Sequence, residues 1–426
     1  MADSELRKAI NRGLASGDLA EALWQVADFE LRTADDAAAV VELVMSHQDL
    51  LLAPPATRSS SLHAVAGLFQ QVETQEAFDL LSEQGLPGLR RLFDALLAEP
   101  VPDERVEDLL FLTKIFILYH DLDDLARLQA AATSPGLAGK YLWSVIFQSI
   151  DEDHPLRREI ADALRDPLPH GFVGVAYLDF VNGLAREGGF EHPFDVPAGH
   201  ALLEGWLIDS DEAHFSYAHS AAAALPFISE PPRGQLLALG LDHPASHVQM
   251  EAAWASAKIG SRAGIDFLAR ACLDPSTSAV AVSYLEELDE LNAIPAKAKD
   301  PDFAAVAEMC RWLAHPMEYG RAPDEVELYD SRTLIWPPAN DEQRLWLVKY
   351  RYRESNEDGS DDVGIGLVGS ITFALFGEVT ADLSAEDVYA LHCCWELEVE
   401  NDPRAPQKRT VAAGRELLRT AGNPGF

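Results

Sequence analysis

The chain has few basic residues for its size. Its 426 residues include 33 Lys and Arg against 70 Asp and Glu, which gives a formal net charge of -37. Nucleic acids and anionic membranes carry dense negative charge, and proteins approach them through basic patches. The shortage of basic residues therefore argues against both as the main partner and is compatible with a basic protein partner. Solubility of a large helical surface would explain the same charge without any partner.

Cysteine is also scarce. The four cysteines are irregularly spaced, at Cys272, Cys310, Cys393 and Cys394. A disulfide framework or a zinc module needs more cysteines at short, regular spacings. We therefore expect reduced thiols and a cytoplasmic protein.

Long apolar runs are missing as well. No apolar stretch approaches the roughly 20 residues that span a bilayer, and the first residues, Met1 to Lys8, contain no apolar segment typical of a secretory signal. We expect a protein that is neither secreted nor embedded in a membrane.

Helical periodicity is what the sequence has in abundance. From the start to about residue 315, apolar residues recur at helical spacing in segments of about 10 to 16 residues. One example is the stripe formed by Val106, Leu109, Leu112 and Phe116, which is typical of a helix face in a core. Proline-containing clusters near residues 54, 100, 167 and 231 separate the segments, because proline cannot continue a helix. The pattern predicts one helix hairpin after another.

An approximate repeat lies within this helical part. Asp209, Asp242 and Asp274 each stand at the edge of a loop, 33 and 32 residues apart, and each is followed by an Ala-rich helical pattern. A single helix pair cannot bury its apolar face and needs its neighbours to do so, so this period predicts a solenoid of stacked helix pairs.

The clearest copy runs from Leu241 to Asp274. An Asp-rich turn precedes a helix with Val248, a pair of alanines and a closing Gly260, and a second helix leads to the next Asp. This unit resembles a HEAT repeat of the armadillo-like type, and the resemblance covers about residues 200 to 315. It implies a surface lined by one helix of each pair, on which a protein partner or a peptide lies.

After about residue 317 the periodicity changes from helical to two. Val326 to Trp336, Arg344 to Arg353 and Val363 to Phe376 are rich in β-branched and aromatic residues and are predicted to be strands. The middle segment alternates aromatic and basic side chains, which predicts an antiparallel sheet with one buried face.

Two helices are predicted to follow these strands. Ser384 with Asp387 has the form of a capping box, which opens a helix to about Glu398. A last helix, about Val411 to Arg419, lies in a locally basic tail. We expect this tail to dock on the rest of the chain, which is acidic. The expected organisation is a HEAT-like α-solenoid over residues 1–317, a small α+β domain over 318–400, and a basic C-terminal tail with a short helix over 401–426.

Several short motifs suggest chemistry, but each has a simpler structural explanation. Gly364 to Gly369 matches the dinucleotide fingerprint, yet it follows a run of acids and continues as a strand, so close packing is favoured. The acidic loop 354–362 begins like an EF-hand but has Ile365 where the final Glu is required, which favours a solvated hairpin loop.

The cysteine pair, the histidine pair and the aromatic-basic alternation also have simpler structural explanations. Adjacent Cys393 and Cys394 would allow a strained disulfide or a reactive thiol, but core packing is the default for cysteine. His243 and His247 share a helix face without a third metal ligand, which favours surface or capping roles. The alternation from Lys349 to Arg353 would suit an RNA-binding strand, but it is also what any half-buried strand shows.

No residue is therefore assigned to catalysis, to a cofactor or to a metal. We expect a non-enzymatic interaction scaffold or adaptor that binds a basic protein partner on the solenoid surface. Two alternatives stay open. One is an acidic inhibitor or immunity-type protein that blocks a basic partner, and the other is an enzyme whose active part is the C-terminal α+β domain.

Overall fold

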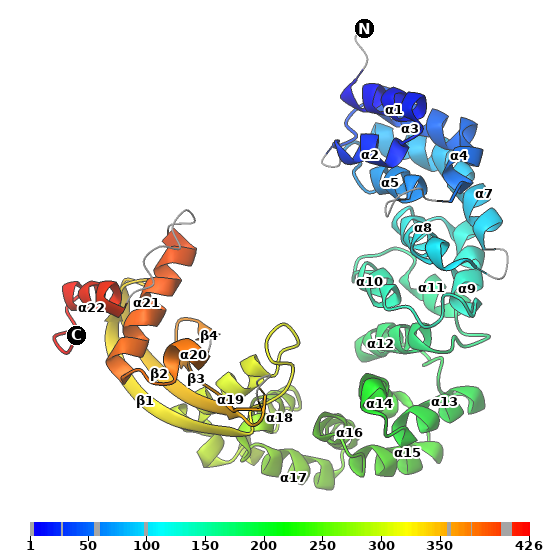
Figure 1. The fold of residues 1–426 in the computed structure, drawn as a ribbon. Helices are drawn as coiled ribbons and strands as arrows, with labels where there is room; N and C mark the ends of the chain where they lie inside the picture. The colour runs from blue at the N-terminus through cyan, green and yellow to red at the C-terminus, as the bar shows by residue number, and fades with distance from the viewer. Residues whose placement is uncertain are drawn as a thin grey trace. The chain divides into compact units, whose positions relative to one another are not determined.

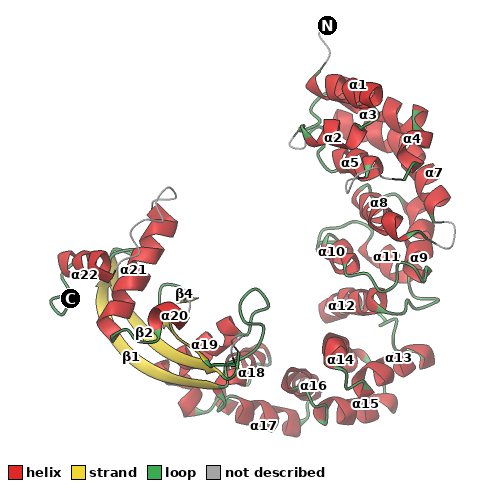
Figure 2. Cartoon of the chain, viewed as in Figure 1, coloured by secondary structure: helices red, strands yellow, loops and turns green. Residues whose placement is uncertain are grey.

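A computed structural model describes residues 4–26, 29–54, 60–97, 101–355, 359–375, 377–401 and 411–426. The chain divides into two compact units, Met1–Leu236 and Leu237–Phe426. The first is helical, and the second begins with helices and continues into a four-stranded antiparallel sheet with further helices (Figure 1, Figure 2). The predicted fold class, mostly α with a small α+β part, is confirmed.

The helices of the first unit are short, and several are joined by single turns of 3-10 helix. Their bounds are α1 (Glu5–Ser16), α2 (Leu19–Trp24), α3 (Ala34–Ser46), α4 (Gln48–Leu52), α5 (Ser61–Leu68), α6 (Gln75–Leu80), the π-helical turn η1 (Leu81–Gly85), α7 (Leu86–Leu96), η2 (Asp103–Arg105), α8 (Val106–Leu118), η3 (Leu122–Asp124), α9 (Leu125–Thr133), α10 (Leu142–Gln148), α11 (Arg157–Ala163), α12 (Phe172–Glu187), α13 (Pro197–Ile208), η4 (Glu212–His214), α14 (Phe215–Ala224) and η5 (Leu225–Phe227). Helix α15 (Pro232–Leu241) contains the division between the units.

These helices pack against their neighbours in an ordered series. Helices α2, α5, α8, α10, α12 and α14 each contact the next in that order (Figure 1). A second set of contacts joins α3 and α4 to α7, α7 to α8, α8 to α9, and α9 to α11. The predicted core stripe of Val106, Leu109, Leu112 and Phe116 is buried between them. Consecutive packing of this kind is compatible with a helical-repeat solenoid.

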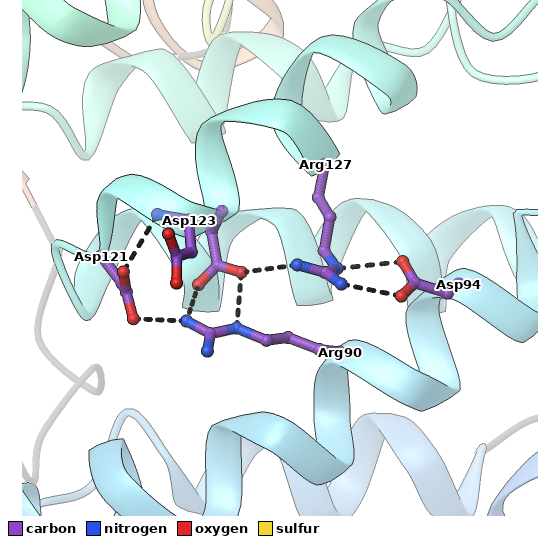
Figure 3. Close-up of polar contacts among 6 residues, drawn as sticks. Arg90, Asp94, Asp121, Asp123 and Arg127 are labelled. Atoms are coloured by element: carbon purple, nitrogen blue, oxygen red, sulfur yellow. Dashed lines mark hydrogen bonds and ion pairs between the residues drawn. The ribbon is translucent and has the colours of Figure 1, made fainter.

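A network of ion pairs joins α7 to the region of η3 and α9 (Figure 3). Arg90 of α7 lies between two carboxylates, with Nη2 at 2.6 Å from Asp121 Oδ2 and Nε at 2.7 Å from Asp124 Oδ1. Arg127 of α9 reaches back to α7, where its Nη2 lies 2.7 Å from Asp94 Oδ2, and its Nη1 lies 3.3 Å from Asp124. The Asp124 side chain is only 3% exposed, so its charge depends on these partners.

The two carboxylates around Arg90 differ in their surroundings. The backbone amide of Asp123 donates to Asp121 Oδ1 at 3.0 Å, and this bond together with Arg90 lowers the pKa of Asp121. Burial raises the pKa of Asp124, against the opposing effect of Arg90. Removing Arg90 would leave Asp124 buried with only the longer contact to Arg127.

We therefore expect Arg90→Met to destabilise the protein by about 3 kcal/mol, because breaking a buried ion pair leaves a buried charge without its partner. Urea unfolding followed by far-UV circular dichroism measures the change. The control is Glu42→Gln, which removes an exposed pair with Arg7 in the same unit and should change stability by no more than about 0.5 kcal/mol. Equal effects of the two substitutions would contradict the structural role of the network.

The second unit begins with a series of paired helices, in which α16 packs on α17, α17 on α18, and α18 on α19. Asp274, one of the repeated aspartates, caps α18 by accepting a hydrogen bond from the Ser276 amide at 2.9 Å. The bounds are α16 (Ser246–Lys258), α17 (Arg262–Ala271), α18 (Pro275–Glu287), η6 (Leu291–Ala293), η7 (Ala296–Lys299) and α19 (Pro301–Leu313).

The sheet follows α19 and has the strand order β1-β2-β3-β4, with all neighbours antiparallel. Its strands are β1 (Glu325–Trp336), β2 (Asp341–Tyr352), β3 (Asp362–Val368) and β4 (Thr372–Ala374). The first two match the predicted strands. The prediction of one strand from Val363 to Phe376 is wrong, because the chain turns after Val368, where the Gly369 amide donates to the Ile371 carbonyl at 3.1 Å. Phe376 lies outside the described residues.

Both faces of the sheet are covered, so the prediction of a single buried face is also wrong. On one face Val348, Tyr350 and Tyr352 pack against α19. On the other face Leu345 and Leu347 pack in a core with residues of α21 (Ala385–Asn401) and α22 (Val411–Thr420). This face of β2 carries Leu345 and Leu347 in its middle and Lys349 and Arg351 towards its end. The basic residues alone therefore do not show whether the face is covered.

The predicted helices after the sheet are confirmed, and a short α20 (Gly377–Thr380) precedes them. Ser384 caps α21, since its Oγ accepts from the Asp387 amide at 3.3 Å. Helix α22 docks on α21, where Arg415 Nε lies 2.5 Å from Asp387 Oδ1. The basic tail residues Arg404, Lys408 and Arg409 lie outside the described residues.

Two buried histidines make stability depend on pH. His192 is held by Asn182 Oδ1 at 3.0 Å and by the Phe194 amide at 3.3 Å, and burial lowers its pKa to about 4. Burial likewise lowers the pKa of His392 to about 4. Their ordinary value is 6.5, so between pH 6.5 and 4 the unfolded chain binds protons that the folded chain does not.

The part of the unfolding free energy that depends on these two histidines should therefore be fully present above pH 6.5 and fall as the pH decreases towards 4. At pH 5 each histidine accounts for a loss of about 2 kcal/mol. His192→Gln, which retains hydrogen-bonding groups but does not titrate, should show a smaller decrease than the wild type. Urea midpoints at about pH 7.5 and about pH 5 compare the two proteins in the range where the histidine titrates. An identical decrease in both would rule out the assignment to His192.

Candidate functional site

A groove of about 390 Å³ crosses α2, α5 and α8 in the first unit. Three successive members of the helix series form its walls. The residues that give the groove its chemistry are Trp24 at the end of α2, His63 on α5, Glu104 in η2, and Glu107 and Phe111 on α8. The structure thus brings together residues that lie far apart in the sequence.

The aromatic residues of the groove are placed by the packing of their helices. Leu19, Ala20 and Leu23 bury the inner side of α2, which leaves Trp24 71% exposed. Across the groove the His63 ring stacks on the Phe111 ring, with centroids 4.2 Å apart and planes 19° apart. The groove therefore presents two separate aromatic surfaces.

A buried ion pair next to the groove fixes the helices that form its walls. Arg105 Nη1 lies 2.7 Å from Asp108 Oδ2, and both side chains are almost fully buried. Arg105 also donates to the carbonyls of Leu52 and Ala53, which fixes the end of α4 against α8. Asp108 Oδ2 accepts from Ser60 Oγ at 2.9 Å, and Ser60 in turn caps α5. These bonds hold α5 and α8 in register on either side of the groove.

Negative charge lies at one wall of the groove. Glu104 and Glu107 are exposed, and neither forms an ion pair with any residue in the described parts of the chain. Aromatic faces attract cations, and long basic side chains bury their aliphatic stems while their charged heads meet carboxylates. The groove therefore suits a lysine or arginine side chain.

The glycines of the dinucleotide-like motif lie in and just after β3. A Cβ on Gly364 would collide with Tyr350, and one on Gly366 would collide with Met309 of α19. The motif continues into a strand and opens no helix, and its glycines allow β3 to pack closely. The close-packing interpretation is confirmed.

The other motifs also have structural positions. Cys393 and Cys394 are both buried, and burial raises the pKa of the Cys393 thiol, which favours its unreactive protonated form. His243 is buried before α16, where its Nδ1 accepts from the Ala245 amide at 3.1 Å, and His247 is exposed. Tyr350 and Tyr352 are buried against α19, so the buried aromatic face predicted for this strand is confirmed.

The acidic loop joins β2 to β3, as the hairpin prediction requires. Asn356, Glu357 and Asp358 lie outside the described residues. Across the parts of the chain that are described, no group of three His, Cys, Asp or Glu side chains is arranged to hold a metal ion. Within the same residues, no helix is both long and apolar enough to cross a membrane.

Comparison of the chain with protein-family models, curated proteins and solved structures found no match. Among the described residues, the groove with its exposed and stacked aromatic side chains is the strongest indication of a site. The sequence analysis did not identify its residues. Trp24, His63 and Phe111 stand in three helical patterns that are not consecutive. The one available signal was Trp24 itself, a large apolar residue next to the buried stripe of α2.

Proposed function

We propose that the protein is a non-enzymatic interaction scaffold built on HEAT-like helix pairs, and that the groove of α2, α5 and α8 binds a basic segment of a protein partner. The observation that carries this proposal is the combination of exposed Trp24, the stacked pair of His63 and Phe111, and the carboxylates of Glu104 and Glu107 in one groove. Exposed aromatic residues in a concave site are typical anchors of protein interfaces.

The charge of the chain supports the same proposal. With a net charge of -37, the protein attracts basic partners over a distance and speeds their association. The resemblance of residues 200 to 315 to HEAT repeats adds an analogy, since stacked helix pairs offer extended surfaces for partners.

Peptides selected by phage display on the full-length protein test this proposal. The strongest peptides should be rich in Lys and Arg, and Trp24→Ala should weaken their binding at least about tenfold, because interface tryptophans carry much of the binding energy. Fluorescence anisotropy with a labelled synthetic peptide measures the affinity. The matched control is Tyr141→Ala, since Tyr141 is also 71% exposed but lies outside the groove.

The acidic wall is tested separately. The double substitution Glu104→Gln with Glu107→Gln should weaken binding of the basic peptide. It should also reduce the loss of affinity on adding salt, because the two carboxylates whose attraction salt would screen are then absent. Binding that is indifferent to ionic strength, or that Trp24→Ala and Tyr141→Ala affect equally, would contradict the proposed function.

A further inference from the structure

A second hollow of about 490 Å³ lies at the other end of α8. Its lining includes Gln70, which follows α5, Lys114 and Leu118 of α8, and His120, Asp151, Asp153, His154 and Pro155. It belongs to the first unit, as the groove does.

The two hollows share a wall. Gln71 lines the groove and its neighbour Gln70 lines the second hollow. On α8, Glu107 and Phe111 face the groove, and Lys114 and Leu118 face the second hollow. Both binding spaces therefore lie along the same stretch of backbone.

The exposure pattern of α8 supports this continuity. Every residue of α8 is buried except Glu107, Phe111, Lys114 and Leu118. These four stand at positions i, i+4, i+7 and i+11, which places them in one row along a single helix face. Neighbouring helices cover the rest of α8, and this row runs from the groove to the second hollow.

The second hollow is a formed site with mixed chemistry. His154 is fixed, with Nε2 at 3.1 Å from the Ile117 carbonyl and Nδ1 accepting from the Leu156 amide at 3.2 Å. The His120 ring meets the His154 ring edge to face at 4.4 Å. Leu118, which is 40% exposed, and Pro155 add apolar surface, while Lys114, Asp151 and Asp153 supply charges of both signs. Lys114 in the lining repels a second cation, whereas Leu118 and Pro155 offer contact to an apolar side chain, so we expect an apolar side chain over Leu118.

We infer that the partner segment lies extended along α8 and fills both hollows, with a cationic side chain in the groove and an apolar side chain over Leu118. This inference rests on the proposed function. Glu107 and Leu118 are eleven positions apart, a distance of about 16 Å on a helix. About five residues of extended chain cover that distance, so the two anchoring side chains of the partner stand about five residues apart.

The test uses the strongest peptide selected on the full-length protein, together with a truncation that keeps only its cationic half. Leu118→Arg adds bulk and positive charge to the second hollow. It should weaken binding of the whole peptide about tenfold, and change binding of the truncation by less than about twofold, because only the whole peptide reaches the second hollow. Ile208→Arg is the matched control, because Ile208 is 59% exposed and lines neither hollow.

The outcomes separate the two claims. If Trp24→Ala weakens the whole peptide and Leu118→Arg has no more effect than Ile208→Arg, the extended binding mode is overturned and the proposed function stands. If neither substitution weakens binding, or if no peptide is selected, both claims are overturned. Circular dichroism of each variant confirms that the fold is retained.

Discussion

The structure of the first unit depends on one constraint, which is that no helix pair can bury its own apolar face. Helix α8 illustrates the consequence. Its apolar residues point in almost every direction, and α5, α7, α9 and α10 contact it from different sides. Within α8 only Glu107, Phe111, Lys114 and Leu118 keep an exposed or half-exposed side chain. Burial by neighbours thus decides which residues of a central helix can meet a partner, and both hollows lie along the one row that remains.

Apolar packing is not directional, so it does not by itself fix how neighbouring helices are placed along one another. Buried ion pairs with defined geometry supply it. Arg105 joins the end of α4 to α8, through the Leu52 carbonyl and Asp108. Arg90 of α7, labelled in Figure 3, pairs with Asp124 at the start of α9. Such pairs add little net stability, because desolvation of the charges offsets their attraction. Their geometric effect matters more here, since the groove keeps its shape only if α5 and α8 stay in register.

Local signals in the sequence predicted much of the fold. Helical periodicity, the capping serine at Ser384 and the first two strands depend on residues close together in the chain, and the structure confirms them. One error is local, because the turn after Val368 is closed by the Gly369 amide on the Ile371 carbonyl, at a Gly-Ser pair that is itself a turn signal. The other concerns longer distances. The second covered face of the sheet is decided by packing against α21 and α22, and alternation in the sequence does not encode those contacts. The groove was missed for the same reason, because it needs three helices that are not consecutive.

Helix α19 explains how a helical series can end in a sheet. Its residues Met309 and Leu313 pack on β2 and β3, while α18 contacts it as the preceding helix in the series. Trp346 Nε1 donates to Asp302 Oδ1 at 2.7 Å, which fixes β2 against the start of α19. The last helix of a packed series has an apolar face that no following helix of the series covers, so another element must cover it. In this chain the sheet covers that face, and the opposite face of the sheet is covered in turn by α21 and α22, with Arg415 and Asp387 paired at their contact.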